Sequence, residues 1–150
     1  MKDRASHIRR ALATGALLLF ITALHLPAQP RPKSFSGEWS YGRNGYSFTL
    51  KLSQRGDSLV GAHCAVTRNA ARIDCAFSED GSPQPVSLAG AITNGRAIVR
   101  FKSSYSEATG SARIVFRGRN IEWTIVRGSV SDGEYYLPAR AVLSRVSGGE

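Results

Sequence analysis

The sequence predicts an all-β protein in which eight or nine antiparallel strands form a meander that closes into a barrel behind an N-terminal signal peptide. Three observations support this fold class. Short segments alternate apolar and polar residues, turn-forming pairs such as Asn94-Gly95 separate them, and no amphipathic helix is longer than two turns. Closure removes exposed strand edges, which favours a barrel over the alternative, a two-sheet sandwich.

The chain begins with the pattern of a secretory signal peptide, predicted over residues 1–28. A basic segment precedes an uncharged apolar run of 14 residues, and Ala28 stands just before the expected cleavage site. An uncleaved anchor is the alternative, but this run is shorter than the roughly 20 residues that span a bilayer. We therefore expect a periplasmic or secreted protein with no stable membrane insertion after cleavage. Residues 29–34 then form a short Pro-rich tail, and residues 35–150 form one barrel domain.

Composition limits the function classes. Hydrophobic residues make up 42% of the chain and charged residues 21%, which excludes a disordered protein. The net charge is +9, and +6 remains after residue 28. Most of the cationic residues in that part of the chain are arginines. Arginine suits planar anions such as carboxylate and phosphate, which points to an acidic partner. The alternative is a basic surface that serves only solubility.

The strand predictions follow the chain in order. Tyr46 opens a strand in which apolar and polar residues alternate without interruption. Hairpin turns at Asn94-Gly95 and Gly118-Arg119 each place the apolar residues of both flanking strands on one face, and that agreement in register supports both hairpins. The predicted strands lie near 36–41, 45–54, 58–67, 72–77, 86–92, 96–103, 111–117, 121–127 and 135–144.

Cys64 and Cys75 are the only two cysteines, and export to an oxidising compartment predicts that they form a disulfide. A hairpin that turns at Asn69-Ala70 would place them opposite each other, at the close spacing that cross-strand disulfides favour. Two cysteines are too few for a structural zinc site, so no metal and no cofactor is expected.

His63 is the only histidine after the leader. If Phe48 faces the core and Arg55-Gly56 forms a two-residue turn, His63 lies opposite Phe48 inside the barrel. The same register, carried across the disulfide hairpin, places Arg72 and Asp74 inside as well. With two aromatic residues from the apolar faces, these polar residues form the predicted ligand-binding set: His63, Arg72, Asp74, Tyr46 and Trp123. The alternative is a β-bulge near Gly61, which would turn His63 and Asp74 toward solvent.

A basic stripe is predicted on the outer face of two neighbouring strands and their turn. It would attract an acidic envelope component, although cations that protect a strand surface from aggregation are the alternative. Nucleic acid is not expected as a partner, because the protein is exported and the stripe lacks interleaved aromatic residues. The predicted surface-binding residues are Arg100, Lys102, Arg113, Arg117 and Arg119.

The opening Gly37-Glu38-Trp39 resembles the start of the lipocalin-like (calycin) barrels. In that family the tryptophan closes the base of the barrel, often beneath an arginine from the last strand, so the resemblance implies this role for Arg140 or Arg145. The chain is also similar to a group of small exported bacterial proteins without a clear function. The residues that carry that similarity are Phe48-Thr49-Leu50, His63-Cys64 and Ile73-Asp74-Cys75.

Three functions follow as hypotheses. The first is a non-catalytic barrel that binds a small or amphiphilic ligand. The alternative is a periplasmic inhibitor or immunity-type protein, similar to the lysozyme-inhibitor barrels, that acts on an acidic partner through the basic stripe and the end loops 103–110 and 131–136. The third is an envelope enzyme, which would require Asp74, Glu107 and Glu122 to converge. Since no catalytic motif is present, we expect a protein that is not an enzyme.

Overall fold

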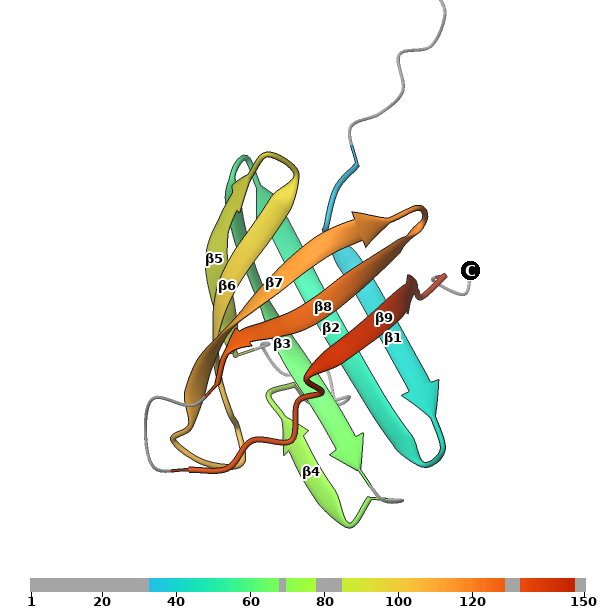
Figure 1. Cartoon of the computed structure of the whole chain (residues 1–150), viewed down its shortest axis with the longest axis vertical. Helices are drawn as coiled ribbons and strands as arrows, with labels where there is room; N and C mark the ends of the chain where they lie inside the picture. The colour runs from blue at the N-terminus through green and yellow to red at the C-terminus, as the bar shows by residue number, and fades with distance from the viewer. Residues whose placement is uncertain (1–32, 68–69, 78–84, 129–132, 148–150) are drawn as a thin grey trace, which may run out of the picture. The chain divides into compact units, whose positions relative to one another are not determined.

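The computed structural model describes residues 33–67, 70–77, 85–128 and 133–147, which belong to one compact unit. The predicted signal peptide and most of the Pro-rich tail lie outside these residues. No helix in the described ranges is long and apolar enough to cross a membrane. The strands, labelled in Figure 1, are β1 (Gly37–Arg43), β2 (Tyr46–Arg55), β3 (Ser58–Thr67), β4 (Arg72–Cys75), β5 (Leu88–Thr93), β6 (Arg96–Lys102), β7 (Thr109–Arg117), β8 (Asn120–Arg127) and β9 (Arg140–Arg145).

Eight of these strands form a closed antiparallel barrel. Around the barrel the order is β1-β2-β3-β5-β6-β7-β8-β9, and β9 pairs with β1 to close it. The closing pairing is short, with Trp39 opposite Arg145 and Ser40 opposite Ser144. β4 is an additional strand that pairs with β3. The barrel prediction is therefore confirmed, and the two-sheet alternative is wrong.

The predicted hairpins have the predicted registers. At the Asn94-Gly95 turn both residues have positive φ, 52° and 71°, as the favoured two-residue hairpin turn requires. Ile92 pairs with Ala97 across this turn, and Phe116 pairs with Ile121 across the Gly118-Arg119 turn. Thr67 pairs with Arg72, which places Cys64 opposite Cys75, and the two cysteines form the predicted disulfide.

Two strand predictions require correction. The β2–β3 turn is Gly56-Asp57 and not Arg55-Gly56, so His63 lies opposite Leu50 and not Phe48. Gly56 takes the first turn position with a φ of 57°, a conformation in which a β-carbon is strained. The predicted last strand, 135–144, begins only at Arg140. Pro138 has no N–H to donate to a strand partner, and the segment before it follows the end of the barrel instead.

Side chains fill the interior of the barrel. Trp39 and Trp123 are the largest fully buried residues, and both indole nitrogens donate hydrogen bonds, to Phe35 O and Pro138 O respectively. The Phe48 ring packs edge-on against Trp123, with 5.3 Å between ring centroids. The remaining core consists of aliphatic and aromatic residues, most of them from the inner faces of the barrel strands. A ligand site is therefore to be sought at the barrel ends and on its outer surface.

Candidate functional site

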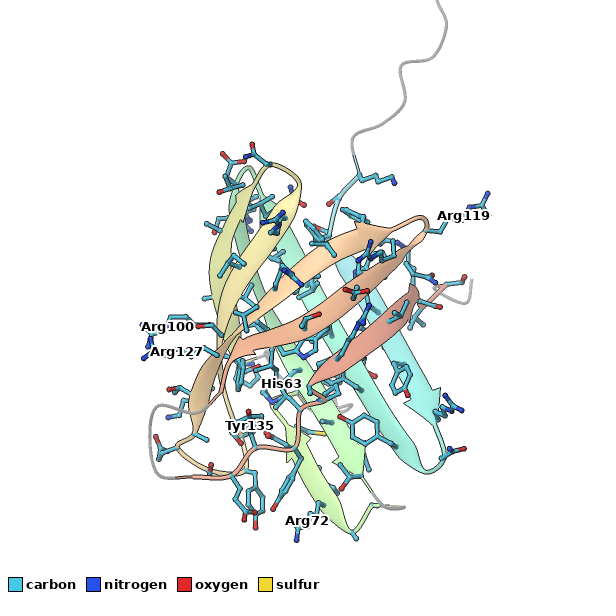
Figure 2. All side chains as sticks on the ribbon, in the orientation of Figure 1. His63, Arg72, Arg100, Arg119, Arg127 and Tyr135 are labelled. Atoms are coloured by element: carbon cyan, nitrogen blue, oxygen red, sulfur yellow. A yellow bond between two sulfur atoms is a disulfide. The ribbon has the colours of Figure 1, made fainter. Side chains whose placement is uncertain are left out.

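His63 and Asp74 both lie on the inner side of the sheet, and both side chains are completely buried. The two-residue shift in the β2–β3 register does not change the face of His63, because side chains alternate with a period of two. The bulge alternative, which would have turned these residues toward solvent, is wrong. They lie at the end of the barrel where β4 extends from β3 (Figures 1 and 2).

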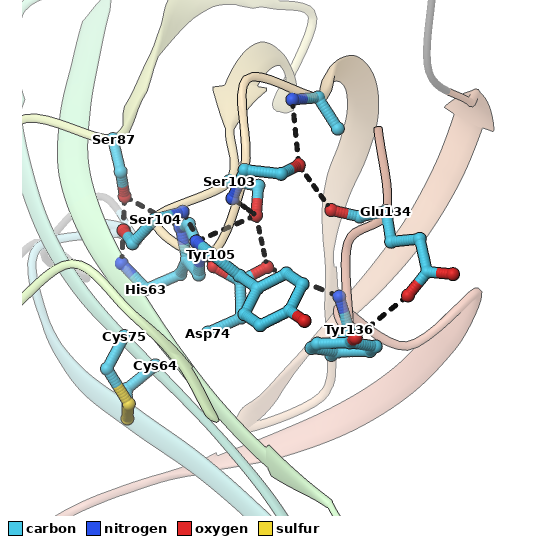
Figure 3. A network of polar contacts seen from close by, with 12 residues as sticks. His63, Cys64, Asp74, Cys75, Ser87, Ser103, Ser104, Tyr105, Glu134 and Tyr136 are labelled. Carbon is cyan, nitrogen blue, oxygen red and sulfur yellow. Dashed lines mark hydrogen bonds and ion pairs between the residues drawn. A yellow bond between two sulfur atoms is a disulfide. The ribbon is translucent and has the colours of Figure 1, made fainter. Parts of the chain in front are cut away.

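Asp74 is the acceptor at the centre of a buried hydrogen-bond network, drawn in Figure 3. Its Oδ1 lies 3.1 Å from His63 Nε2 and accepts from the Ser104 N–H at 2.7 Å. Its Oδ2 accepts from Ser103 Oγ at 2.8 Å and from the Tyr136 N–H at 3.2 Å. Ser103 and Ser104 begin the loop between β6 and β7, and Tyr136 lies in the segment before β9. One carboxylate therefore fixes both end loops.

Hydrogen bonds to its charged form keep this carboxylate ionised. Burial raises the pKa of Asp74, but hydrogen bonds from His63, Ser103 and the Ser104 N–H lower it further than burial raises it, to about 2. Asp74 is consequently a charged group at neutral pH, stabilised in the interior by hydrogen bonds to its charged form.

His63 connects Asp74 to Ser87. Its Nδ1 lies 2.7 Å from Ser87 Oγ, which also accepts the His63 backbone N–H at 3.1 Å. This chain of hydrogen bonds from serine to histidine to aspartate resembles the active sites in which a histidine base activates a serine nucleophile and an aspartate orients the histidine. His63 has no exposed surface with which to reach a leaving group, so we interpret this network, the Asp74 clamp, as a device that holds the end loops.

Arg72 and Tyr46, two further predicted ligand-binding residues, also lie at this end of the barrel. Arg72 was predicted inside, and this is wrong: its side chain is 47% exposed, because β4 extends beyond the sheet that would enclose it. Its guanidinium donates to Tyr136 Oη at 3.1 Å. Tyr46 is half-buried and donates to Tyr136 O at 3.1 Å, and burial raises its pKa. Trp123 is a core residue.

The opposite end of the barrel holds an open cleft of about 490 Å³. The Trp39 and Phe116 rings form its apolar part. Three cations surround them, and no acidic residue is among the residues that line the cleft: Lys33, Ser34, Trp39, Phe116, Gly118, Arg119, Asn120, Ser144 and Arg145. Figure 2 places Arg119 and Arg72 at opposite ends of the barrel. The sequence singled out Arg119 as part of the basic stripe and, through the resemblance, an arginine against Trp39. It did not predict that they share a cleft, because Lys33 and Arg145 come from the two ends of the domain.

Two of the cleft cations are held on its aromatic rings. The Arg145 guanidinium lies 4.1 Å from the Trp39 ring and donates to Ser34 O at 3.0 Å and to Ser36 O. Lys33 Nζ lies 5.6 Å from the Phe116 centroid and donates to Gly118 O. The resemblance implied that either Arg140 or Arg145 packs against Trp39, and in the structure this residue is Arg145.

Some residues of the predicted basic stripe form ion pairs with carboxylates, and others do not. Arg117 Nε lies 3.2 Å from Glu122, whose carboxylate also accepts from Arg140 at 2.8 Å. Hydrogen bonds from Arg140 and Arg117 lower the pKa of Glu122. Lys102 pairs with Glu107 at 2.8 Å. Arg119 belongs to the cleft, whereas Arg100 and Arg113 remain on the outer face of the sheet.

The three acids required by the enzyme hypothesis lie in different surroundings. Asp74 is inside the barrel, Glu122 is on the outer face beneath two arginines, and Glu107 is exposed in the loop after β6. The structure does not bring them together.

Comparison with known proteins found no matching family model, no matching curated protein and no matching solved structure. The eight-stranded antiparallel closed barrel is thus established by the strand pairings of this chain, and no family is identified for it.

Proposed function

We propose that this chain is a non-catalytic binding protein for a small amphiphilic anion, which it holds in the cleft at the Trp39 end of the barrel. The observation that carries this proposal is the lining of that cleft, in which two aromatic rings lie among three cations and no carboxylate. A volume of about 490 Å³ falls in the range of small-molecule sites. The proposed ligand is of the small or amphiphilic class expected from the sequence. The proposed site lies at one end of the barrel, whereas the sequence placed it in the barrel interior.

Each part of the cleft has a separate role in this proposal. The apolar part of the ligand packs against the half-buried Phe116 ring, beside the Arg145 guanidinium that covers Trp39. This contact removes apolar area of the ligand and of the ring from water. The anionic group faces Arg119, which makes no hydrogen bond or ion pair with another described residue and is free to turn toward a ligand. Arg145 is fixed by two backbone carbonyls, so it supplies a positive charge at a set position.

Dye binding tests the proposal with a charged and an uncharged probe. We expect anilinonaphthalene sulfonate to bind and to change the fluorescence of Trp39, and we expect Arg119→Ser to weaken its binding by about fivefold, the effect of one exposed charge pair. Binding of phenylnaphthylamine, which lacks the sulfonate, is expected to be unchanged by Arg119→Ser.

Arg43→Ser is the matched control, because Arg43 is an exposed arginine that flanks the two-residue hairpin turn Asn44-Gly45, as Arg119 is an exposed arginine within the turn Gly118-Arg119. The proposal fails if the sulfonate dye does not bind the folded chain. It also fails if Arg43→Ser and Arg119→Ser weaken binding equally, because net charge alone would then explain the affinity.

A second candidate function is the inhibitor or immunity-type protein that acts on an acidic partner. The observation that favours it is the ordered barrel end above the Asp74 clamp, where Tyr105 is 56% exposed and packs 4.7 Å from Tyr136, which Arg72 covers from another side. Tyrosine and arginine on fixed loops are typical of protein contacts. This function is tested by capturing binding partners from an envelope extract at low salt, with the wild-type protein and with Tyr105→Ala as bait. A partner that both proteins retain equally would contradict this function.

A further inference from the structure

Four arginines from three neighbouring strands share the outer face of the sheet, and we call them the arginine face. Arg96 and Arg100 lie on β6, Arg113 on β7 and Arg127 on β8. Arg100 pairs with Ser111, and Ser111 pairs in turn with Arg127, so these residues form one row across the sheet. With strands about 4.8 Å apart, the two arginines start about 10 Å from each other. Figure 2 shows both projecting from the same side of the barrel.

The charges of the arginine face are not neutralised within the described part of the chain. Arg96, Arg100 and Arg127 are exposed and Arg113 is half-buried, and none of the four forms a hydrogen bond or an ion pair with another described residue. This distinguishes them from Lys102, Arg117 and Arg140, each of which has a carboxylate partner. Uncompensated positive charge on neighbouring strands attracts an extended anionic surface more strongly than one small anion.

Two aliphatic side chains lie among these arginines in exposed positions. Ile98, which is 46% exposed, stands between Arg96 and Arg100 on β6 and opposite Arg113 on β7. Val126 is 50% exposed, because the register shift between Ser111 and Ala112 leaves it unpaired beside Arg127. The face therefore combines cations with apolar side chains.

We propose that the arginine face docks reversibly on an anionic lipid surface. The guanidinium groups bind phosphate oxygens of the headgroups, and Ile98 and Val126 reach the apolar boundary beneath them, as on surfaces that lie in a membrane interface. The two aliphatic residues favour a lipid surface over a soluble polyanion, since a polyanion offers them no apolar environment. This inference is independent of the cleft and of its ligand.

Vesicle cosedimentation of the folded chain tests the proposal. We expect binding to vesicles that contain phosphatidylglycerol, no binding to vesicles of phosphatidylcholine alone, and weaker binding as salt is raised. Each charge removed near an anionic surface weakens partitioning by about fivefold, so Arg100→Ser with Arg127→Ser is expected to weaken it by about 25-fold. The matched control is Arg43→Ser with Arg55→Ser, which removes the same charge from exposed positions on β1 and β2.

The substitution Ile98→Ser distinguishes binding to a lipid surface from binding to other polyanions. It is expected to reduce vesicle binding while leaving binding to heparin, a sulfated polysaccharide, unchanged. Equal losses in the two double variants would overturn the proposal, and so would binding to heparin without binding to vesicles. Urea midpoints within experimental error of wild type show that each variant is folded.

Discussion

Replacement of Asp74 by asparagine tests the account of the buried network most directly. The carboxylate accepts two hydrogen bonds on each oxygen, and one donor on each side is a backbone N–H, from Ser104 or from Tyr136. An asparagine amide carries an NH₂ group in place of one oxygen. In either orientation this group opposes one of the two backbone N–H donors, which cannot reverse their direction as a hydroxyl can.

The expected magnitude follows from two contributions. An unsatisfied buried N–H costs about 1–3 kcal/mol. The shift of the Asp74 pKa from 3.8 to about 2 corresponds to about 2 kcal/mol of stability at neutral pH, which the uncharged amide lacks. Since these contributions overlap, we expect Asp74→Asn to lower the free energy of unfolding by about 3 kcal/mol at pH 7.

The effect also depends on pH, with a definite sign. The folded state holds the Asp74 pKa below its unfolded value, so this stability is present above about pH 4 and is lost as the pH falls toward 2. Asparagine does not titrate. The difference between wild type and Asp74→Asn is therefore expected to shrink by about 1 kcal/mol at pH 3 and by about 2 kcal/mol at pH 2.

Urea unfolding, followed by the fluorescence of the two buried tryptophans, measures both quantities. Asp57→Asn is the control, because Asp57 is exposed in the β2–β3 turn and the substitution is expected to stay within about 0.5 kcal/mol of wild type. A difference below about 0.5 kcal/mol for Asp74→Asn, or a difference that does not change between pH 7 and pH 2, would refute the reasoning.

Three further predictions concern stability. Replacing Cys64 and Cys75 together by serine opens a loop with a sequence separation of 11 and is expected to cost about 3 kcal/mol; an unchanged urea midpoint would contradict this. Gly90→Ala is expected to cost about 1–3 kcal/mol in the same measurement, because its β-carbon would meet the backbone oxygen of Ile98, which cannot move aside. Ser87→Ala removes the hydroxyl beside His63 and is expected to cost about 1–2 kcal/mol while sulfonate dye binding stays unchanged; weaker dye binding would show that the two barrel ends are coupled.

The sequence was sufficient for the features that a hairpin specifies locally. A two-residue turn with Asn94-Gly95 sets the register of its own strands, and the apolar residues of both strands then fall on one face. The disulfide hairpin was predictable for the same reason. Gly56 could be either the first or the second residue of the β2–β3 turn. The two choices give registers that differ by two residues, and alternation did not distinguish them because both registers place the same side chains on the inner face.

The candidate sites depend on contacts that no local pattern contains. Alternation places Arg72 on the same face as Asp74, but it does not reveal that the barrel ends between them. Ser87 and Ser103 come from separate segments, and only the closed barrel brings them to one histidine–aspartate pair. The cleft likewise requires the two ends of the domain to meet.

The short pairing between β1 and β9 has a consequence for how the molecule folds. It joins Trp39 to Arg145, which are 106 residues apart in the chain, whereas most other pairings join strands that follow one another. Bringing distant segments together has a larger entropic cost than extending a hairpin, so the meander is expected to assemble first and the pairing between the chain ends last.

Contacts that form after the rate-limiting step slow unfolding without speeding folding. The Arg145 bonds to the backbone of residues 34 and 36, together with the Val146 N–H bond to Glu38 O, lie where that last pairing forms. They are therefore expected to set how long the barrel stays closed once formed, and to have little influence on how quickly it forms.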